Sequence, residues 1–245
     1  MFSATRQYSH LWHQVRRLKH QLSHLRDLTN EIRALNELDF AAVCMNLKVT
    51  QPKRRLKVIG YQASSINPRF IPVTEVAVPP ASISGYSPDD NVSPGANYTL
   101  MLLDADAPSG MQAVCRGSTN PVVLPFLHWM VVNISTPTFD VVNKSNNPEA
   151  IALYDYAPCC PAPGSGLHRY VYLAFAQHTP IPQPDPSYLL RNSCWSERAH
   201  FELNEFVHDY LHRAPVASDW FVTHWTPEVG WTMRRTVSIN FERKY

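Results

Sequence analysis

Four short apolar runs, separated by proline-bearing segments, constrain the fold of this chain more than any other feature. The runs lie at residues 56–61, 98–104, 127–134 and 169–177, and prolines occur between them, for example in residues 78–84. Each run has the length of a strand, and no helical pattern lies between the runs. Strands without intervening helices predict an antiparallel or mixed β-sandwich.

The composition supports a single β-rich body. The chain has 245 residues, of which 44% are apolar and 17% charged, so a folded core is expected and a fibrous or disordered chain is excluded. Twenty-one prolines against eight glycines, with 11% aromatic residues, favour short strands joined by loops over a helical bundle. The length fits one large domain, or a medium domain with extensions.

Charge, cysteine content and hydropathy exclude several classes of protein. A formal charge of +2 gives no field that attracts nucleic acid across the whole surface, so no direct nucleic-acid partner is expected. Five cysteines, two of them adjacent, indicate buried thiols in a reducing compartment rather than a disulfide framework. No transmembrane segment and no secretory signal is recognisable, and we expect a cytoplasmic protein.

The start of the chain differs from the rest. Apolar residues recur at helical spacing between residues 11 and 35, with basic residues and histidines between them, which predicts an amphipathic helix. Three interpretations stay open: a helix packed on its own domain, a helix that binds a protein partner, and a mitochondrial targeting segment, since no acidic residue precedes Asp27. The last would make the localisation mitochondrial.

Two later segments have clear patterns. Four basic residues within residues 53–57 are expected to form a solvated face or linker. Residues 196–213 carry apolar side chains on one helical face, with Ser196 available as a cap, so a helix is expected there.

Two carboxylates lie at the end of the second apolar run, and a histidine lies at or just before the start of each of the next two runs. Because side chains alternate along a strand, Asp104 and Asp106 are expected on one face, and His168 and Tyr170 on one face with Arg169 on the other. Two carboxylates at such a short separation raise one another's pKa unless cations or hydrogen-bond donors lie beside them.

The same alternation places His128 on the face of Met130 and Val132, over apolar surface. Alone, each such residue would most simply be a hydrogen-bonded core histidine or a turn aspartate. Their combination makes them candidate site residues.

Three motifs carry a resemblance. Residues 104–109 read Asp-Ala-Asp-Ala-Pro-Ser, residues 127–134 read Leu-His-Trp-Met-Val-Val-Asn-Ile, and residues 161–171 read Pro-Ala-Pro-Gly-Ser-Gly-Leu-His-Arg-Tyr-Val. In this order they closely resemble the signatures of the phosphatidylethanolamine-binding protein (PEBP) family, also called the Raf kinase inhibitor protein family. The expected organisation is an N-terminal helical extension at residues 1–50, a PEBP-like domain at 51–226 and a C-terminal tail at 227–245.

The resemblance implies a PEBP-like antiparallel β-sandwich with a few peripheral helices and a small pocket for phosphate-like or carboxylate groups. It implies ligand-binding roles for the following residues: Asp104, Asp106, Pro108, His128, Pro163, Gly166, His168 and Tyr170. The peptide bond before Pro108 is expected to be cis, which is a rare and structured feature. No cofactor and no metal is implied.

Binding of an anion beside two carboxylates requires protonated histidines or other donors. With a reference histidine pKa of about 6.5, phosphate is expected to bind more tightly near pH 6 than near pH 8. The chain departs from the family at Phe126, often Trp, and at Leu127, often a second His, so the site loses a polar neighbour. The loop at residues 110–125 is longer and less charged than in animal members.

Three functions are compatible with this pattern. The first is a binding protein that holds phosphate, phosphoethanolamine or a carboxylate and regulates a kinase or serine carboxypeptidase, which it contacts through residues 1–40. The second is an accessory enzyme of fungal secondary metabolism that couples anhydride-bearing polyketides, with His128, His168 and Asp106 moving protons. The third is a mitochondrial large-ribosomal-subunit protein. The Gly-x-Ser-x-Gly, His-Glu-x-x-His and phosphate-loop signatures are absent, which favours a binding protein over an enzyme.

Overall fold

The computed structural model describes the following residues: 14–16, 18–19, 22, 44, 47–50, 52, 54–61, 70–84, 96–107, 125–135, 147–182, 195–199, 201–212 and 214–226. The chain divides into two compact units, Met1–Asp39 and Phe40–Tyr245. In the first unit the described residues are helical, and the side chains of Val15, Leu18 and Leu22 are exposed. The other apolar positions of the expected helix, at residues 11, 25, 32 and 35, lie outside the described residues, as does the expected tail at 227–245.

The described part of the second unit is mainly β. Its strands are β1 (Lys57–Ile59), β2 (Ser82–Ser84), β3 (Tyr98–Asp104), β4 (Phe126–Ile134), β5 (Ile151–Tyr154), β6 (Leu167–Ala176) and β7 (Ala217–His224). Two helices, α5 (Trp195–Ala199) and α6 (Leu203–Tyr210), precede β7. The expected mainly-β class with few helices is confirmed.

The strands form two antiparallel sheets. The large sheet has the order β5-β4-β3-β6-β7, and β1 pairs with β2 in a small sheet. The register places Asp104, the last residue of β3, opposite Phe126 of β4 and Tyr170 of β6. The end of β3 therefore meets the starts of β4 and β6 at one end of the sheet, and this is where the candidate site residues lie.

An apolar core covers each face of the large sheet. One core includes Val58, Ile71, Val76, Ile83, Leu100, Leu102, Tyr170, Tyr172 and Phe221. The other includes Met101, Leu103, Met130, Val132, Val171, Leu173, Phe175, Leu203 and Val207. Consecutive residues of β3 alternate between the two cores, which is the period of two expected of a strand covered on both faces.

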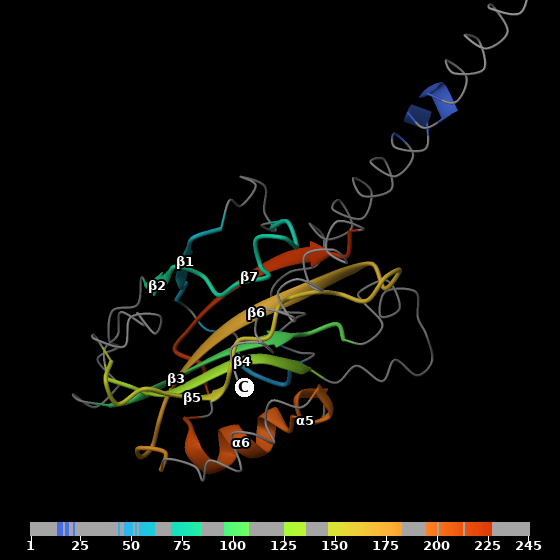
Figure 1. Ribbon diagram of the computed structural model, residues 1–245. Coiled ribbons are helices and arrows are strands. Elements are labelled where there is room, and N and C mark those ends of the chain that lie inside the picture. Colours follow the sequence, from blue (N-terminus) through green and yellow to red (C-terminus); the bar gives the residue numbers. More distant parts are fainter. Residues whose placement is uncertain are drawn as a thin grey trace, which may run out of the picture. The chain divides into compact units, whose positions relative to one another are not determined.

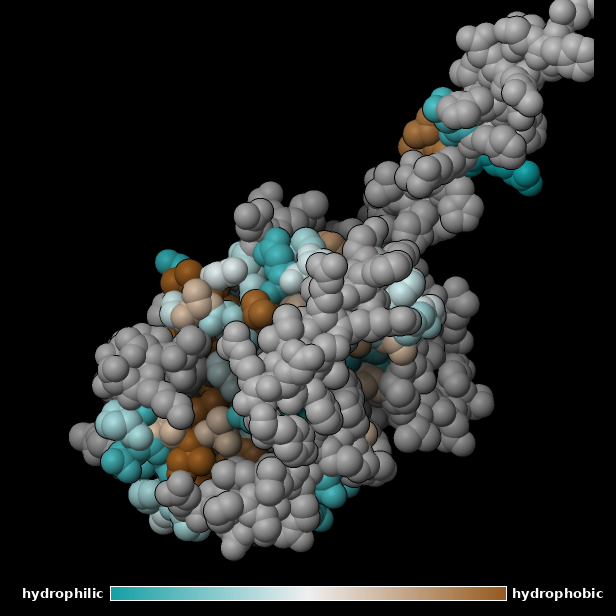
Figure 2. Space-filling view, viewed as in Figure 1, coloured by the Kyte–Doolittle hydropathy of each residue, from teal (hydrophilic) through white to brown (hydrophobic). Residues whose placement is uncertain are grey.

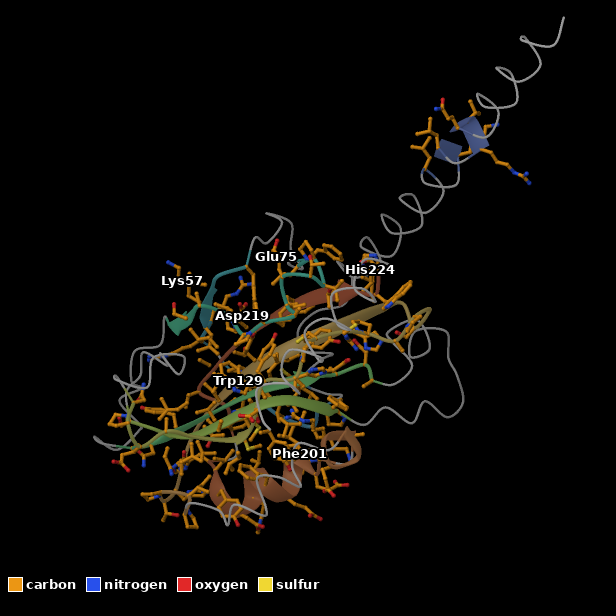
Figure 3. All side chains as sticks on the ribbon, viewed as in Figure 1. Lys57, Glu75, Trp129, Phe201, Asp219 and His224 are labelled. Carbon is orange, nitrogen blue, oxygen red and sulfur yellow. The ribbon has the colours of Figure 1, made fainter. Side chains whose placement is uncertain are left out.

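The figures show how the two cores are covered. In Figure 1, α5 and α6 lie on one side of the large sheet, and β1 and β2 lie on the other. Figure 3 shows Phe201 on the helix side and Lys57 and Glu75 on the opposite side, with Trp129 on the sheet between them. Apolar and hydrophilic residues are interspersed on the face shown in Figure 2, and Ile59 and Val78 are among the exposed apolar side chains.

The helix expected at residues 196–213 is two helices. α5 ends at Ala199, and α6 begins at Leu203 after Glu202, whose side chain makes no capping hydrogen bond. The expected cap, Ser196, lies inside α5. The apolar spacing is helical, because Leu203 and Val207 are buried four residues apart on the face that meets the sheet.

Three strands lie outside the expected apolar runs. β2 lies within the proline-bearing residues 78–84, and β5 is short. β7 contains four polar residues among its eight, so it lacks a clear apolar run, yet it pairs with β6 along its whole length. Residues 55 and 70 make parallel bridges to Ser218 and Val222 of β7.

Cys44 and Cys159 are buried thiols and Cys160 is half-buried, while Cys115 and Cys194 lie outside the described residues. No helix in the described part of the chain is both long enough and apolar enough to cross a membrane.

Candidate functional site

Asp104 and His168 form the centre of the site. Nδ1 of His168 lies 2.7 Å from Oδ2 of Asp104, and the two side chains are only 3% and 5% exposed. The other carboxylate oxygen of Asp104 accepts a hydrogen bond from the backbone N–H of Asp106 at 2.9 Å. Because Asp104 lies opposite Tyr170, and His168 is two residues from Tyr170 on the same face, the strand register itself creates this contact.

Ser165 belongs to the same group, although it is not among the residues expected from the sequence. Its Oγ atom lies 2.9 Å from Nε2 of His168 and donates to the carbonyl of Ala162 at 2.8 Å. The turn that carries it is fixed by the Ser165 N–H, which donates to the same carbonyl, and by Gly164 and Gly166, whose φ angles are 78° and 89°. A serine between two glycines, three residues before a histidine, was the available signal.

The hydrogen bonds of His168 favour its protonated form. Burial alone would lower the pKa of His168, but the hydrogen bond and charge of Asp104, together with the charge of Asp106, outweigh burial and raise the pKa above 6.5. The Asp104 carboxylate accepts at Nδ1, and the Ser165 hydroxyl, which donates to Ala162, accepts at Nε2. With this orientation of the Ser165 hydroxyl both ring nitrogens can donate, as they do in an imidazolium.

Asp106 has a different partner from Asp104. Its carboxylate accepts from Nη2 and Nε of Arg169 at 2.6 and 2.8 Å, and from the Arg169 backbone N–H at 2.9 Å. Both side chains are almost completely buried. The expectation that the two carboxylates share one face is corrected, because Asp106 lies beyond the last residue of β3, where strand alternation no longer applies. Arg169 neutralises Asp106, so the repulsion between the carboxylates is reduced.

His128 reaches the site through an irregularity in β4. Leu102 pairs with Trp129 while Leu103 pairs with Leu127, so His128 is the extra residue of a bulge. A bulge re-aims a side chain. The ring of His128 consequently makes an edge contact with Tyr170, at a centroid distance of 5.1 Å. The expectation that His128 shares a face with Met130 and Val132 is therefore wrong, since those two residues belong to the core under α6.

The pKa of His128 is shifted in the opposite direction to that of His168. Burial lowers the pKa of His128 to about 4, despite the nearby charge of Asp104. His128 is thus neutral near pH 6 and near pH 8, and it cannot contribute to a charge change over that range. Its Nδ1 lies 3.0 Å from the Ala157 carbonyl, which can only accept, so Nδ1 carries the proton and Nε2 is left as an acceptor.

Tyr170 supplies a buried hydroxyl beside these groups. Burial, and next the charge of Asp104, raise the pKa of Tyr170 well above 10, so the phenol keeps its proton. The hydroxyl oxygen is completely buried, and its hydrogen bond to the Asp104 carboxylate falls short of standard geometry. A buried donor held by such a weak bond can turn to a bound ligand, which makes it a candidate ligand contact.

Arg198 of α5 holds the backbone beside the site in place, although it is not among the residues expected from the sequence. Its guanidinium donates to the backbone carbonyls of Leu127, His128 and Asp155 at 3.1, 2.9 and 2.7 Å. The carbonyl of His128 also accepts the Ala157 N–H at 2.7 Å. Arg198 thus fixes the backbone of the bulge, and only the three-dimensional structure reveals this role.

The other expected ligand residues lie in two places. Pro163 is exposed and Gly166 half-buried, in the turn that carries Ser165. Pro108 with its peptide bond, and the loop at residues 110–124, lie outside the described residues. No group of three His, Cys, Asp or Glu side chains within the described ranges is arranged to hold a metal ion.

We use the name polar cluster for Asp104, His128, Ser165, His168 and Tyr170. The cluster combines an imidazole whose pKa is raised and two hydroxyls with one acceptor nitrogen and one carboxylate hydrogen-bonded to that imidazole. Such a set can bind a small anion and can also move protons.

Comparison with known proteins identifies the family. The profile of the phosphatidylethanolamine-binding protein family matches residues 50–218. Similar solved structures include a carboxypeptidase Y inhibitor complexed with its cognate proteinase, with 18% identity, a TM-score of 0.49, and coverage of 81% of this chain and 96% of that chain. A phosphatidylethanolamine-binding protein from Plasmodium vivax has 17% identity, a TM-score of 0.47 and coverage of 70% and 85%. YbcL from E. coli has 16% identity, a TM-score of 0.41 and coverage of 70% and 98%. Because the family profile matches more than half of its residues, the chain belongs to the phosphatidylethanolamine-binding protein family.

Proposed function

We propose that the protein is a binding protein whose polar cluster holds a small anion that itself carries a hydrogen-bond donor, such as monoanionic phosphate or phosphoethanolamine, and that it regulates a protein partner. One observation carries the proposal: His168 lies between Asp104 and Ser165, with both ring nitrogens in hydrogen bonds that suit the imidazolium. The membership of the phosphatidylethanolamine-binding protein family supports it.

The charges of the site favour an anion. Arg169 neutralises Asp106, and His168 compensates Asp104, so neither carboxylate is left alone to repel a negative ligand. The hydroxyl of Tyr170 is a buried donor whose hydrogen bond to Asp104 falls short of standard geometry. Donation from this hydroxyl to an anion would satisfy it more fully.

The tautomer of His128 favours an anion that carries a proton. Because Nδ1 donates to the Ala157 carbonyl, Nε2 of the neutral ring can only accept. A P–OH group or an ammonium group can donate to this nitrogen, whereas a fully deprotonated oxyanion cannot. Sulfate, which has the shape of phosphate but no proton near neutral pH, is therefore expected to bind less well.

The first test is thermal unfolding of the full chain with phosphate, phosphoethanolamine or sulfate at about pH 6 and about pH 8. The pKa of His168 is raised, so its protonated form predominates below that pKa and is lost as the pH rises through it. Phosphate at a hundred times its dissociation constant stabilises by about 2.7 kcal/mol, a shift of several degrees. We expect the larger shift at the lower pH, and a smaller shift with sulfate.

Matched variants complete this test. His168→Ala should abolish the phosphate shift, while His208→Ala, at a histidine whose side chain is 76% exposed on α6, should retain it. Equal shifts in these two variants, or equal shifts with phosphate and sulfate, would contradict the proposed binding mode.

A further inference from the structure

Three side chains of the polar cluster form a chain of hydrogen bonds from the surface to the interior. Ser165 Oγ lies 2.9 Å from His168 Nε2, and His168 Nδ1 lies 2.7 Å from Asp104 Oδ2. Ser165 is half-buried, whereas the side chains of His168 and Asp104 are almost fully buried. The backbone N–H of Asp106 holds the other oxygen of Asp104. A hydroxyl, an imidazole and a carboxylate in this order are the groups that activate a serine as a nucleophile.

The turn that carries Ser165 leaves one side of it open. Gly164 and Gly166 both have positive φ, and a Cβ atom at Gly164 would meet no atom within 4 Å. The backbone N–H of Gly166, the residue after the serine, donates to no backbone carbonyl in the turns and loops that the structure describes. In serine hydrolases of the α/β class, the N–H that follows the nucleophile stabilises the oxyanion. Gly166 is the corresponding donor here.

We propose that Ser165, His168 and Asp104 form a catalytic triad that transfers the acyl group of small carboxylic esters to water. This activity goes beyond the proposed anion binding, although it uses residues of the same polar cluster. The protein would then be both an anion-binding protein and a slow serine esterase.

The reaction proceeds in two balanced steps. Oγ of Ser165 attacks the ester carbonyl carbon and gives its proton to Nε2 of His168, and the carbon–oxygen bond to the alcohol breaks as the alcohol takes that proton. Water then attacks the Ser165 ester through the same base, the acid leaves, and the proton returns to Oγ. Asp104 stays ionised throughout and stabilises the imidazolium. Water is the only co-reactant, and nothing is oxidised or reduced.

The two activities require opposite protonation of His168. The titratable groups beside this ring are Asp104 on β3, His128 on β4 and Tyr170 on β6, and Asp106 after β3 acts on the ring through its charge while bonded to Arg169. The two carboxylates raise the pKa of His168 above 6.5 against the effect of burial. Below that pKa, Nε2 donates to Ser165, whose hydroxyl donates to Ala162. Above it, the hydroxyl proton can turn to Nε2, so ester hydrolysis should rise with pH while anion binding falls.

The test uses the full chain and p-nitrophenyl acetate. Release of p-nitrophenolate is followed from about pH 6 to about pH 9, and the acetylated residue is located by mass spectrometry after acid quenching. We expect an acetyl group on Ser165 and a rate that rises through the pKa of His168. Ser165→Ala should lower the rate by at least about tenfold, since the nucleophile is lost.

The control is Ser82→Ala, at a half-buried serine of β2 in the small sheet, which should keep the wild-type rate. Melting curves of both variants establish that they are folded, and acetylation of the wild-type chain does not depend on any variant. Acetylation confined to lysines, or equal rates for Ser165→Ala and Ser82→Ala, would overturn the proposal.

Phosphate-induced stabilisation at about pH 6, measured on the same samples, separates this proposal from the proposed function. A phosphate shift without acetylation of Ser165 rejects the triad and leaves the anion site. Acetylation of Ser165 without a phosphate shift supports the triad and rejects the anion site.

Discussion

Asp104 and Asp106 are two residues apart, yet they have different roles. Asp104 is hydrogen-bonded to a histidine that can lose its proton, whereas Asp106 is bonded three times to an arginine that cannot. The first pair can respond to pH and ligands. The second pair fixes the position of β6 relative to the end of β3, and so holds the first pair in register.

This difference leads to a prediction for Asp106. Asp106→Asn removes the carboxylate charge that is bonded to the buried Arg169 guanidinium, so we expect a loss of about 3–5 kcal/mol in the free energy of unfolding. Urea unfolding measures this loss. The control is Asp209→Asn, at an aspartate whose side chain is 60% exposed beside His208, which should change the stability by less than about 1 kcal/mol. Similar losses in both variants would show that the Asp106 pair is not structural.

Residue-level prediction succeeded where alternation along a strand held, and failed where it did not. Alternation predicted that His168 and Tyr170 share a face and that Arg169 points away, which the structure shows. It failed at Asp106, beyond the end of β3, and at His128, in the bulge. A bulge depends on how two strands pair, and strand pairing is not visible in the sequence of one strand.

At the scale of elements, the apolar runs predicted β1 and the three central strands, β3, β4 and β6, and missed β2, β5 and β7. β3, β4 and β6 are buried on both faces, so most of their residues are apolar and the runs are easy to recognise. β2 and β5 have three and four residues, and β7 is half polar, so neither length nor pattern distinguishes them from loops. The short helix α5 is equally hard to recognise from the sequence, although it supplies Arg198.

Arg198 gives a prediction at this scale. Arg198→Met removes three hydrogen bonds to backbone carbonyls of β4 and the end of β5, and we expect a loss of about 3 kcal/mol or more in urea unfolding. Because the charge of Arg198 also helps to lower the pKa of His128, the pKa of His128 should rise from about 4 in an NMR titration. The neighbouring exposed Glu197→Met should leave both quantities unchanged. An unaltered His128 titration in a destabilised Arg198 variant would show that Arg198 does not act on the site.

At the scale of the whole molecule, the chain has a PEBP-family match in its second unit, and the described residues of its first unit are helical. The family match covers residues 50–218, and the compact second unit, Phe40–Tyr245, contains the complete polar cluster. In the first unit, Val15, Leu18 and Leu22 are 48%, 57% and 64% exposed on a helix with basic neighbours. The small-ligand chemistry proposed here would therefore belong to the second unit, and the predicted contact with a protein partner to the first.

This separation can be tested by deleting residues 1–39. Since the polar cluster lies entirely in the second unit, the truncated chain should keep the melting temperature and the phosphate shift of the full chain. Inhibition of a serine carboxypeptidase, the predicted partner class, should be lost with the exposed apolar side chains of the helix. Replacement of Val15, Leu18 and Leu22 by Ser in the full chain should weaken inhibition as much as the deletion does. Arg16→Ser and Lys19→Ser are the controls. They should have a smaller effect, because a screened surface charge contributes little. Inhibition by the truncated chain at the level of the full chain would place the partner surface on the second unit, and the helix would then have no part in the regulation proposed here.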